Sequence, residues 1–324
     1  MLTIIVAFLA SAAGTWLFID WLKKRNLVAH ENDRTMHSGA VPQGGGAPVI
    51  VAAIGATLLQ GPGTPALEMV LAIAAGLAVL SADNDRRDIA FPLRLAAHAV
   101  AAFLALTFLP AAHPVLGGWF PIWLDRLLVL IALVWFINLY NFMDGIDGIA
   151  GIETISIAVG ALAVSRIAGG VSDLDGLTCA ILGASAGFLV WNWHKARIFL
   201  GDVGSIPLGF VTGVILIQLA VTHSLAAALI LPLYYLSDAT LTLLRRFSRG
   251  EKVWLAHREH TYQRAARAVG SHSAIVLRIA ACNVVLILAA VLALSVPLIA
   301  FAIAVAAVGV LMRHLEGLAA GVAP

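Results

Sequence analysis

Apolar runs long enough to cross a lipid bilayer recur along the whole chain. The run from Leu2 to Ile19 contains no charged residue, and neither does the shorter stretch from Leu127 to Ile137 within another run. Crossing ~30 Å of hydrocarbon takes about 20 helical residues, and a helix satisfies its backbone polar groups internally. Hydrophobic residues make up 61% of the chain and charged residues only 12%, unlike a soluble domain. The sequence therefore predicts an all-α, polytopic integral membrane helix bundle.

Eleven runs of this kind predict about 11 transmembrane helices. They cover Leu2–Ile19, Ala47–Leu59, Leu67–Leu80, Leu95–Leu109, Leu127–Tyr140, Ile149–Val164, Leu177–Trp191, Ile206–Leu219, Ala226–Leu236, Ile275–Leu294 and Val296–Met312. The 324 residues have room for these helices and their loops, and we expect no attached soluble module. Residues 1–324 are therefore expected to form a single domain.

Basic residues predict the orientation of the helices. The first apolar run has no basic residue before it and Lys23, Lys24 and Arg25 after it, so we expect a retained helix rather than a cleaved signal peptide. With the N-terminus outside and the C-terminus inside, all of the 20 Lys and Arg residues except Arg126 and Arg166 lie on the cytoplasmic side. The predicted cytoplasmic segments are about 20–46, 83–94, 141–148, 192–205 and 238–274.

The segment from Asn138 to Gly148 places polar groups at the end of an apolar helix. Every third residue is polar: Asn138, Asn141, Asp144 and Asp147. This spacing aligns them along one slowly turning side of a helix, and the intervening glycines leave room for a ligand. Helix capping would explain one Asp-Gly pair but not two, so we favour a binding site.

The segment Phe199–Ser205 follows a predicted cytoplasmic helix end. Glycines flank Asp202, and the next helix would offer its unpaired N–H groups to an anion. An acid beside an anion site favours a divalent ion between them. The alternative, that Asp202 merely begins the helix, is weaker because Ser205 could begin it alone.

A basic loop from Arg245 to Arg267 contains the run His257–Arg264. The order of its histidines differs from His-Glu-x-x-His, and no cysteine cluster accompanies them, so zinc ligation is disfavoured. Arginine and histidine side chains suit phosphate binding. The alternative is a loop that fixes topology and contacts anionic lipid.

Three further features carry weaker signals. The run Asn32–His37 precedes three glycines, Gly44 to Gly46, at a helix start, which could hold a phosphate or act as a hinge. Another charged run, Asp83-Asn84-Asp85, closes a predicted helix on the internal side. Cys179 and Cys282 lie in separate apolar runs and predict neither a disulfide nor a metal site.

Together the three long motifs resemble those of the polyprenyl-phosphate N-acetylhexosamine-1-phosphate transferases, the WecA/MraY superfamily of the glycosyltransferase family 4 type. Asn138–Gly148, Phe199–Ser205 and His257–Arg264 match the family patterns Asn-x-x-Asn-x-x-Asp-Gly-x-Asp-Gly, Phe-x-Gly-Asp-x-Gly-Ser and His-Arg-x-His-x-Tyr-Gln-Arg in order. The spaced histidines are more similar to the WecA side. Where the family has paired Asp residues, this chain has Asn84-Asp85, and Gln43 and Lys195 also depart from the pattern.

The resemblance implies a reaction, a cofactor and a location. The family transfers an N-acetylhexosamine 1-phosphate from a UDP-N-acetylhexosamine to undecaprenyl phosphate with release of UMP, using Mg²⁺ or Mn²⁺. It implies a multi-pass protein of the bacterial cytoplasmic (inner) membrane with its site facing the cytosol, initiating O-antigen or another cell-surface polysaccharide. No nucleic acid partner is expected, and a homodimer is left open.

The resemblance also assigns roles to individual residues. The implied catalytic residues are Asp85, Asp144, Asp202, His257 and His260, of which Asp202 and Asp144 would hold the metal. The implied substrate-binding residues are Asn138, Asn141, Asp147, Asn192, Arg258, Arg264 and Gly45.

Two alternatives remain at this point. One is the phospho-MurNAc-pentapeptide transferase of peptidoglycan synthesis, which acts on UDP-MurNAc-pentapeptide. The other is a cation-coupled transporter, but transporter acids gather near the bilayer midplane, whereas the acids here lie at predicted cytoplasmic ends.

Overall fold

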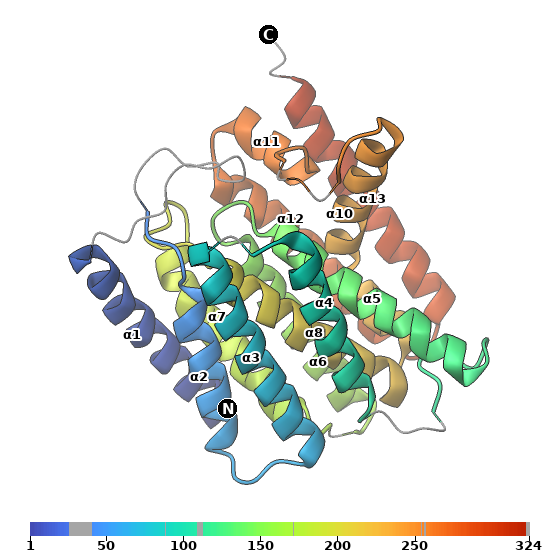
Figure 1. Cartoon of the computed structure of the whole chain (residues 1–324). Coiled ribbons are helices and arrows are strands. Elements are labelled where there is room, and N and C mark those ends of the chain that lie inside the picture. Colours follow the sequence, from blue (N-terminus) through green and yellow to red (C-terminus); the bar gives the residue numbers. More distant parts are fainter. Residues whose placement is uncertain are drawn as a thin grey trace.

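The computed structural model describes residues 1–25, 41–87, 89–108, 113–170, 172–253, 255 and 257–321, without the side chains of residues 85–87. The secondary structure of this part is all-α, as predicted (Figure 1). In chain order its helices are α1 (Leu2–Lys24), α2 (Gly46–Leu58), α3 (Pro65–Arg87), α4 (Phe91–Leu106), α5 (Ile122–Met143), α6 (Ile149–Ile167), α7 (Asp175–Asn192), α8 (Asp202–Thr222), α9 (Leu225–Ile230), α10 (Leu233–Ser248), α11 (Thr261–Val269), α12 (His272–Leu292) and α13 (Pro297–Ala320).

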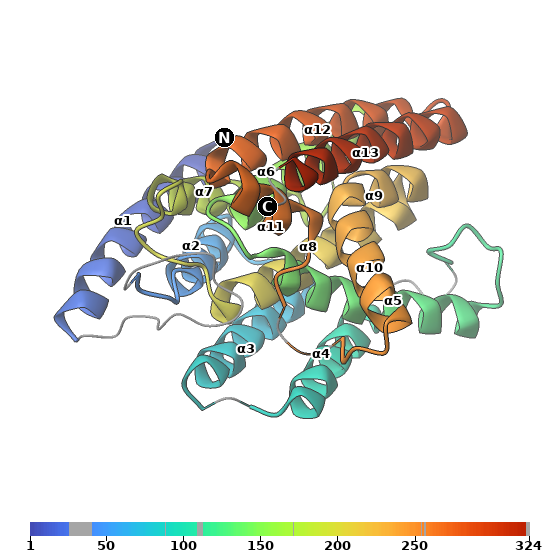
Figure 2. The ribbon, with the colours of Figure 1, turned by 90° about the horizontal axis from the view of Figure 1, so that it is seen from above.

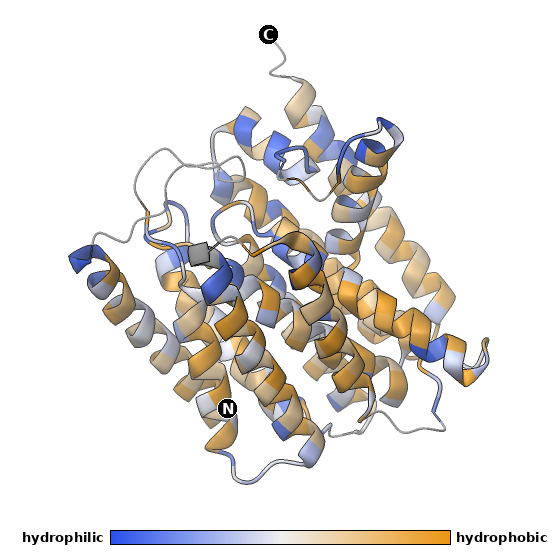
Figure 3. Cartoon of the chain, in the orientation of Figure 1, coloured by the Kyte–Doolittle hydropathy of each residue, from blue (hydrophilic) through white to orange (hydrophobic). Residues whose placement is uncertain are grey.

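Seven helices in the described ranges are long and apolar enough to cross a membrane: α1, α3, α5, α6, α8, α12 and α13. Helices α2 and α4 are apolar but shorter. Hydrophobic residues cover the helices, while hydrophilic residues gather at the end of the bundle that carries α11 and the segment before it (Figure 3). The predicted polytopic helix bundle is confirmed, and the count of 11 spans stays a prediction.

Two prolines act differently from each other. The predicted helix Ala226–Leu236 is interrupted, because α9 ends at Ile230 and α10 begins at Leu233, with Pro232 between them. Proline has no N–H to continue the helical ladder, so a break there is expected. Pro207, in contrast, lies in the interior of α8, which begins at Asp202 and continues past it.

Helix α8 lies at the centre of the bundle. Of its apolar window, 78% is buried inside the protein, compared with 22% to 61% for the other six long helices. It packs against α5, α3 and α2, while α7 packs against α1 and α6 on another side (Figure 2). Helices α12 and α13 lie together, and α12 also contacts α6. A central helix whose first residue is Asp202 places that residue among several neighbouring helix ends.

Candidate functional site

Asp202 is held by side chains from three other helices. Gly201, at the N-cap of α8, has φ of 73°, a left-handed value that glycine adopts without strain. Asn141 at the end of α5 donates its side-chain amide to Asp202 Oδ1 at 2.7 Å, and Asn84 at the end of α3 donates to Oδ2 at 3.1 Å. Arg94 Nη1 lies 3.5 Å from the same Oδ2. The carboxylate is therefore positioned by neutral and cationic donors.

Ser205 ties the start of α8 to the end of α5. Its hydroxyl accepts a hydrogen bond from Asn141 Nδ2 at 2.8 Å and donates to the Gly201 carbonyl at 3.2 Å. Helix α8 starts at Asp202, three residues before Ser205, so Asp202 does begin this helix, as in the alternative that the sequence disfavoured. Asp202 lies in the first helical turn, where backbone N–H groups and the helix dipole favour a negative charge.

Asp144 ends α5 and lies close to two other carboxylates. Removal from water, together with the negative charges of Asp202 and Asp147, raises the pKa of Asp144 to about 7. Carboxylates brought together in this way are the oxygen donors that fit a hard divalent ion. Asp144 and Asp202 carry the type of donor that Mg²⁺ prefers, and their assignment as metal ligands stays a prediction.

Asp147 is fully buried and contacts two histidines that sequence reasoning missed. His194 Nδ1 lies 2.8 Å from Asp147 Oδ2, and His272 Nδ1 lies 3.3 Å from the same oxygen. The Ala196 N–H also donates to Oδ2, at 3.1 Å. His194 and His272 are 47 and 125 residues from Asp147, so no sequence spacing pointed to the cluster.

Two of the predicted substrate-binding amides make contacts within the protein. Asn192 is buried, accepts a hydrogen bond from the Gly148 N–H at 2.9 Å and donates to the Ile198 carbonyl at 2.9 Å. It thereby fixes the loop after α7 against the start of α6. Asn138 donates to the Val134 carbonyl at 2.7 Å, within α5. Their role toward a substrate stays a prediction.

The glycine run before α2 serves close packing. The N–H groups of Gly44 and Gly45 donate to the Phe199 carbonyl and that of Gly46 to the Leu200 carbonyl, at 2.8 to 3.1 Å. A Cβ on Gly46 would lie 2.1 Å from Gly204 Cα. The backbone donors that the sequence offered to a phosphate at Gly45 are thus engaged inside the protein, and the run binds the Phe199–Ser205 segment instead.

His260 holds the start of α11 rather than facing solvent. It is 1% exposed, and its Nδ1 lies 3.6 Å from Asp238 Oδ1. Asp238 also accepts the N–H groups of Thr261 at 2.9 Å and Tyr262 at 3.2 Å, so a side chain of α10 caps α11. The His257 and His260 rings lie 4.7 Å apart, with His257 only partly buried.

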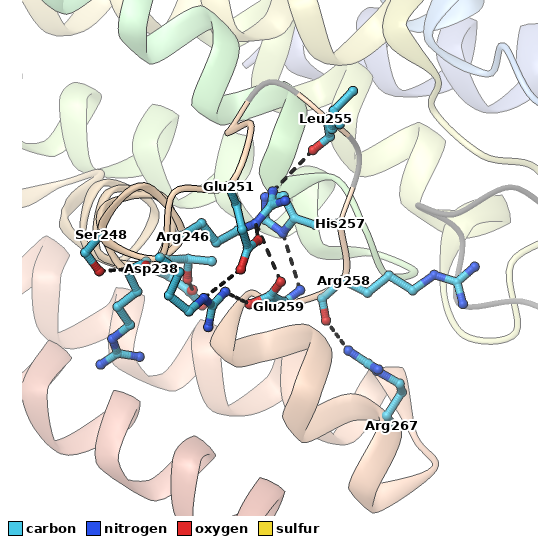
Figure 4. A network of polar contacts seen from close by, with 12 residues as sticks. Asp238, Arg246, Ser248, Glu251, Leu255, His257, Arg258, Glu259 and Arg267 are labelled. Carbon is cyan, nitrogen blue, oxygen red and sulfur yellow. Dashed lines mark hydrogen bonds and ion pairs between the residues drawn. The ribbon is translucent and has the colours of Figure 1, made fainter.

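The rest of the histidine loop is a network of ion pairs (Figure 4). Arg246 is 6% exposed, donates to Glu251 at 2.7 Å and lies 3.5 Å from Glu259. The carbonyl of Arg258 accepts a hydrogen bond from Arg267, while the Arg258 guanidinium extends away from the two glutamates (Figure 4). Arg264 is exposed. Arg264 therefore presents positive charge to solvent, and the Arg258 guanidinium lies apart from the two glutamates (Figure 4).

The third motif packs directly on the first. The Tyr262 hydroxyl donates to the Phe142 carbonyl at 3.2 Å, and a Cβ on Gly145 would lie 2.4 Å from that hydroxyl and 2.5 Å from Gln263 Nε2. Gly145 is thus required for close approach of the two segments. The structure therefore brings together all three motifs, which lie up to about 120 residues apart.

Some predicted residues lie outside what the structure describes. The side chain of Asp85 and the run Asn32–His37 fall there. In contrast, Asn84 and Arg94 are described and contact Asp202 directly.

Comparison with known proteins supports the resemblance. Residues 67–220 match the model of the family described as glycosyl transferase family 4. The chain is 25% identical over 294 residues to the probable undecaprenyl-phosphate N-acetylglucosaminyl 1-phosphate transferase of Bacillus subtilis (strain 168), covering 86% of this chain and 81% of the relative. It is 29% identical over 235 residues to the phospho-N-acetylmuramoyl-pentapeptide-transferase of Shouchella clausii, covering 64% and 71%. A similar enzyme of Anoxybacillus flavithermus is 44% identical over 70 residues, 21% of this chain and 22% of the relative.

Proposed function

Because this chain belongs to glycosyl transferase family 4, we propose that it transfers an N-acetylhexosamine 1-phosphate from a UDP-sugar to undecaprenyl phosphate and releases UMP. The observation that carries the proposal is the contact of Asp202 with Asn141 and Asn84, at the point where three helix ends meet. Such a site suits an initiating enzyme of surface polysaccharide synthesis in the bacterial cytoplasmic membrane, with the site on the cytosolic side.

The reaction joins two anions, a phosphate monoester and a pyrophosphate. Their repulsion is strong wherever water is scarce. When bound at Asp202 and Asp144, Mg²⁺ would screen this repulsion and stabilise the charge on the departing UMP. The monoester is already ionised near neutral pH, since its second pKa is about 6, so the attack needs no strong general base.

The side chains around Asp202 would orient the reacting groups. Asn141, which is itself hydrogen-bonded to Ser205, holds one carboxylate oxygen, and Asn84 with Arg94 holds the other, so the carboxylate cannot rotate freely. A fixed ligand needs little reorganisation during the reaction. Asp85 stays a proposed catalytic residue because it follows Asn84 in the same helix end.

The wall beside this centre would hold the nucleotide and the sugar. The hydrogen bond from the Gly148 N–H to Asn192 joins the segment that contains Asp147 to the end of α7. Asn138 lies in α5, the helix before that segment. Guanidinium groups form forked hydrogen bonds with phosphates, and His257 lies beside Arg258 in the sequence. We therefore assign Arg258, Arg264 and His257 to phosphate charge, and His260 to positioning of this loop.

A second candidate substrate is UDP-MurNAc-pentapeptide. Relatives with the phospho-N-acetylmuramoyl-pentapeptide-transferase description share 29% to 44% identity over shorter stretches, close to the similarity of the Bacillus subtilis relative. The greater coverage of that relative, 86% of this chain, favours an N-acetylhexosamine. Membership of a transferase family also disfavours the transporter alternative.

One assay tests both the reaction and the metal position. Purified protein in detergent, given undecaprenyl phosphate and Mg²⁺, should release UMP from a UDP-N-acetylhexosamine and not from UDP-MurNAc-pentapeptide. Asp202→Asn should reduce transfer by about 100-fold or more while the protein stays folded. Asp20→Asn, a change at an exposed acid of α1, is the matched control and should transfer normally. Retained transfer in Asp202→Asn would refute the metal assignment.

A further inference from the structure

We propose that Asp147, His194 and His272 form a second metal site, selective for a nitrogen-preferring divalent ion such as Zn²⁺ and separate from the Mg²⁺ position at Asp202. The proposal rests on the geometry of these side chains and is independent of the proposed transfer reaction. Among the described residues, they are the one group of at least three His, Cys, Asp or Glu side chains with metal-ligand spacing.

The three ligands come from three separate elements. Asp147 lies between α5 and α6, His194 follows α7, and His272 is the first residue of α12. One ligand atom from each lies within 4.8 Å of the others. Around a tetrahedral ion with bonds of about 2.0–2.2 Å, neighbouring ligand atoms are roughly 3.3–3.5 Å apart. His272 Nδ1 lies 3.3 Å from Asp147 Oδ2, which matches this spacing, while His194 Nδ1 at 2.8 Å lies closer than a shared ion would place it.

The charges in the cluster favour a cation. The Asp147 side chain is 0% exposed, and a buried carboxylate needs a compensating positive charge. His272 Nδ1 accepts the Asp147 N–H at 3.3 Å, so this nitrogen carries a lone pair. The same nitrogen lies 3.3 Å from Asp147 Oδ2, which also carries lone pairs. A metal ion between the two acceptors would bond to both, at the cost of the 3.3 Å hydrogen bond from the Asp147 N–H.

The donor set selects the type of ion. Two imidazole nitrogens with one carboxylate are typical of Zn²⁺, whereas Mg²⁺ prefers an all-oxygen shell. The Ala196 N–H donates to Asp147 Oδ2 and would orient the carboxylate as an outer-shell contact. Three protein ligands leave a fourth position open, next to the segment that Asn192 joins to Gly148. A water molecule or a polar group of a bound ligand would complete the coordination.

A competing explanation is a hydrogen-bonded triad without metal, in which protons on the two histidine rings balance the negative charge of the Asp147 carboxylate. Cobalt binding separates the two explanations, because Co²⁺ occupies zinc sites and absorbs visible light. The full chain without a polyhistidine tag is purified in detergent, stripped with a chelator and titrated with Co²⁺ in saturating Mg²⁺. We expect one equivalent of saturable binding, with the absorption of a tetrahedral site, and its displacement by Zn²⁺.

Variants locate the site. His194→Gln and His272→Gln should each weaken Co²⁺ binding at least about tenfold, since each removes one of three ligands. His223→Gln is the matched control, because His223 follows the last residue of α8 at the end opposite to Asp202. It should bind Co²⁺ normally, as should Asp202→Asn. Neither UDP-sugar nor lipid is present, so failure of the transfer proposal would not change this result.

A measurement on the unaltered chain guards against variants that fail to fold. Cu²⁺ bound in excess Mg²⁺ should show electron paramagnetic resonance couplings to two nitrogen ligands. The proposal is overturned if the chain shows no saturable Co²⁺ binding, if both histidine variants bind as tightly as the unaltered chain, or if the Cu²⁺ spectrum lacks nitrogen coupling.

Discussion

The side-chain amide of Asn84 donates a hydrogen bond of 3.1 Å to Asp202 Oδ2, across a sequence separation of 118 residues. The oxygen of the same amide accepts the Ile89 N–H at 2.9 Å, which fixes the orientation of Asn84. An amide supplies a neutral donor to the carboxylate, whereas an aspartate at this position would supply a second negative charge. Asn84 therefore lowers the negative charge of the site and satisfies one oxygen of the Asp202 carboxylate with a neutral donor.

The substitution Asn84→Asp should make the protein more dependent on divalent ions. Two carboxylates in contact repel each other, and the lost hydrogen bond adds to the effect, so we expect the metal-free protein to be destabilised by about 1–3 kcal/mol. Mg²⁺ should then raise the melting temperature of Asn84→Asp more than that of the unaltered protein. Thermal unfolding in detergent, with and without Mg²⁺, measures this increase in melting temperature for each protein. Asn84→Ala is the control, since it removes the donor without adding charge, and it should show no larger response to Mg²⁺ than the unaltered protein.

The raised pKa of Asp144 predicts how Mg²⁺ binding depends on pH. In the metal-free protein Asp144 keeps its proton up to about pH 7, whereas the unfolded chain loses it near its ordinary value of 3.8. Between these values the folded state binds more protons, so its stability falls as pH rises, by at most ~1.4 kcal/mol per pH unit. Mg²⁺ must displace that proton, and its affinity should therefore increase from about pH 6 to about pH 8. Calorimetric titrations at several pH values would measure the Mg²⁺ affinity. The assignment is contradicted if the affinity does not change with pH. It is also contradicted if Asp144→Asn shows the same pH dependence as the unaltered protein.

The cap that Asp238 provides should stabilise α11 in a pH-dependent manner. Burial alone would raise the pKa of Asp238, but His260, the Thr261 N–H and the Tyr234 hydroxyl hold the pKa below its ordinary value. The stabilisation is therefore fully present above the ordinary pKa of about 3.9 and is lost as pH falls through the lowered value. At neutral pH, Asp238→Asn should destabilise the protein by about 1–3 kcal/mol, because an amide is a weaker acceptor for two backbone N–H groups.

Thermal unfolding across the acid range measures this difference, which should shrink as pH falls. Asp125→Asn tests whether any buried capping acid gives the same result, since Asp125 accepts the N–H groups of Val115 and Leu116 far from α11. Only Asp238→Asn should also reduce transfer, because α11 positions Tyr262 against the Asp144 segment.

Two glycines of α2 give a matched test of packing. A Cβ on Gly46 would lie 2.1 Å from Gly204 Cα and 2.3 Å from Gly204 N, and neither backbone atom can move without shifting α8. Gly46→Ala should therefore destabilise the protein by about 2–4 kcal/mol or prevent folding. Gly55→Ala lies in the same helix with no atom within 4 Å of the added Cβ and should be neutral or stabilising by up to ~1 kcal/mol. Equal melting temperatures for the two variants would show that the close contact is not needed.

Sequence patterns determined the helical class and the three segments that carry the candidate site. Length and continuity of apolar runs predict helices because the lipid interior leaves backbone groups no other partner. The run from Asn138 to Gly148 was recognisable because its polar residues repeat at a helical spacing and its glycines need room, both of which are local properties. Helix ends were less predictable: α8 begins at Asp202, four residues before the apolar run that predicted it.

Tertiary structure decided what the individual residues do. Gly44–Gly46 looked like a phosphate loop, yet their N–H groups bond to the Phe199 and Leu200 carbonyls, because an unpaired donor inside a bundle takes whichever acceptor the packing brings near. The contacts of Asp202 with Asn84 and of Asp147 with His272 join residues more than 100 positions apart. Such contacts depend on how α3, α8 and α12 pack, and packing follows side-chain shape along whole helices, which no short motif contains.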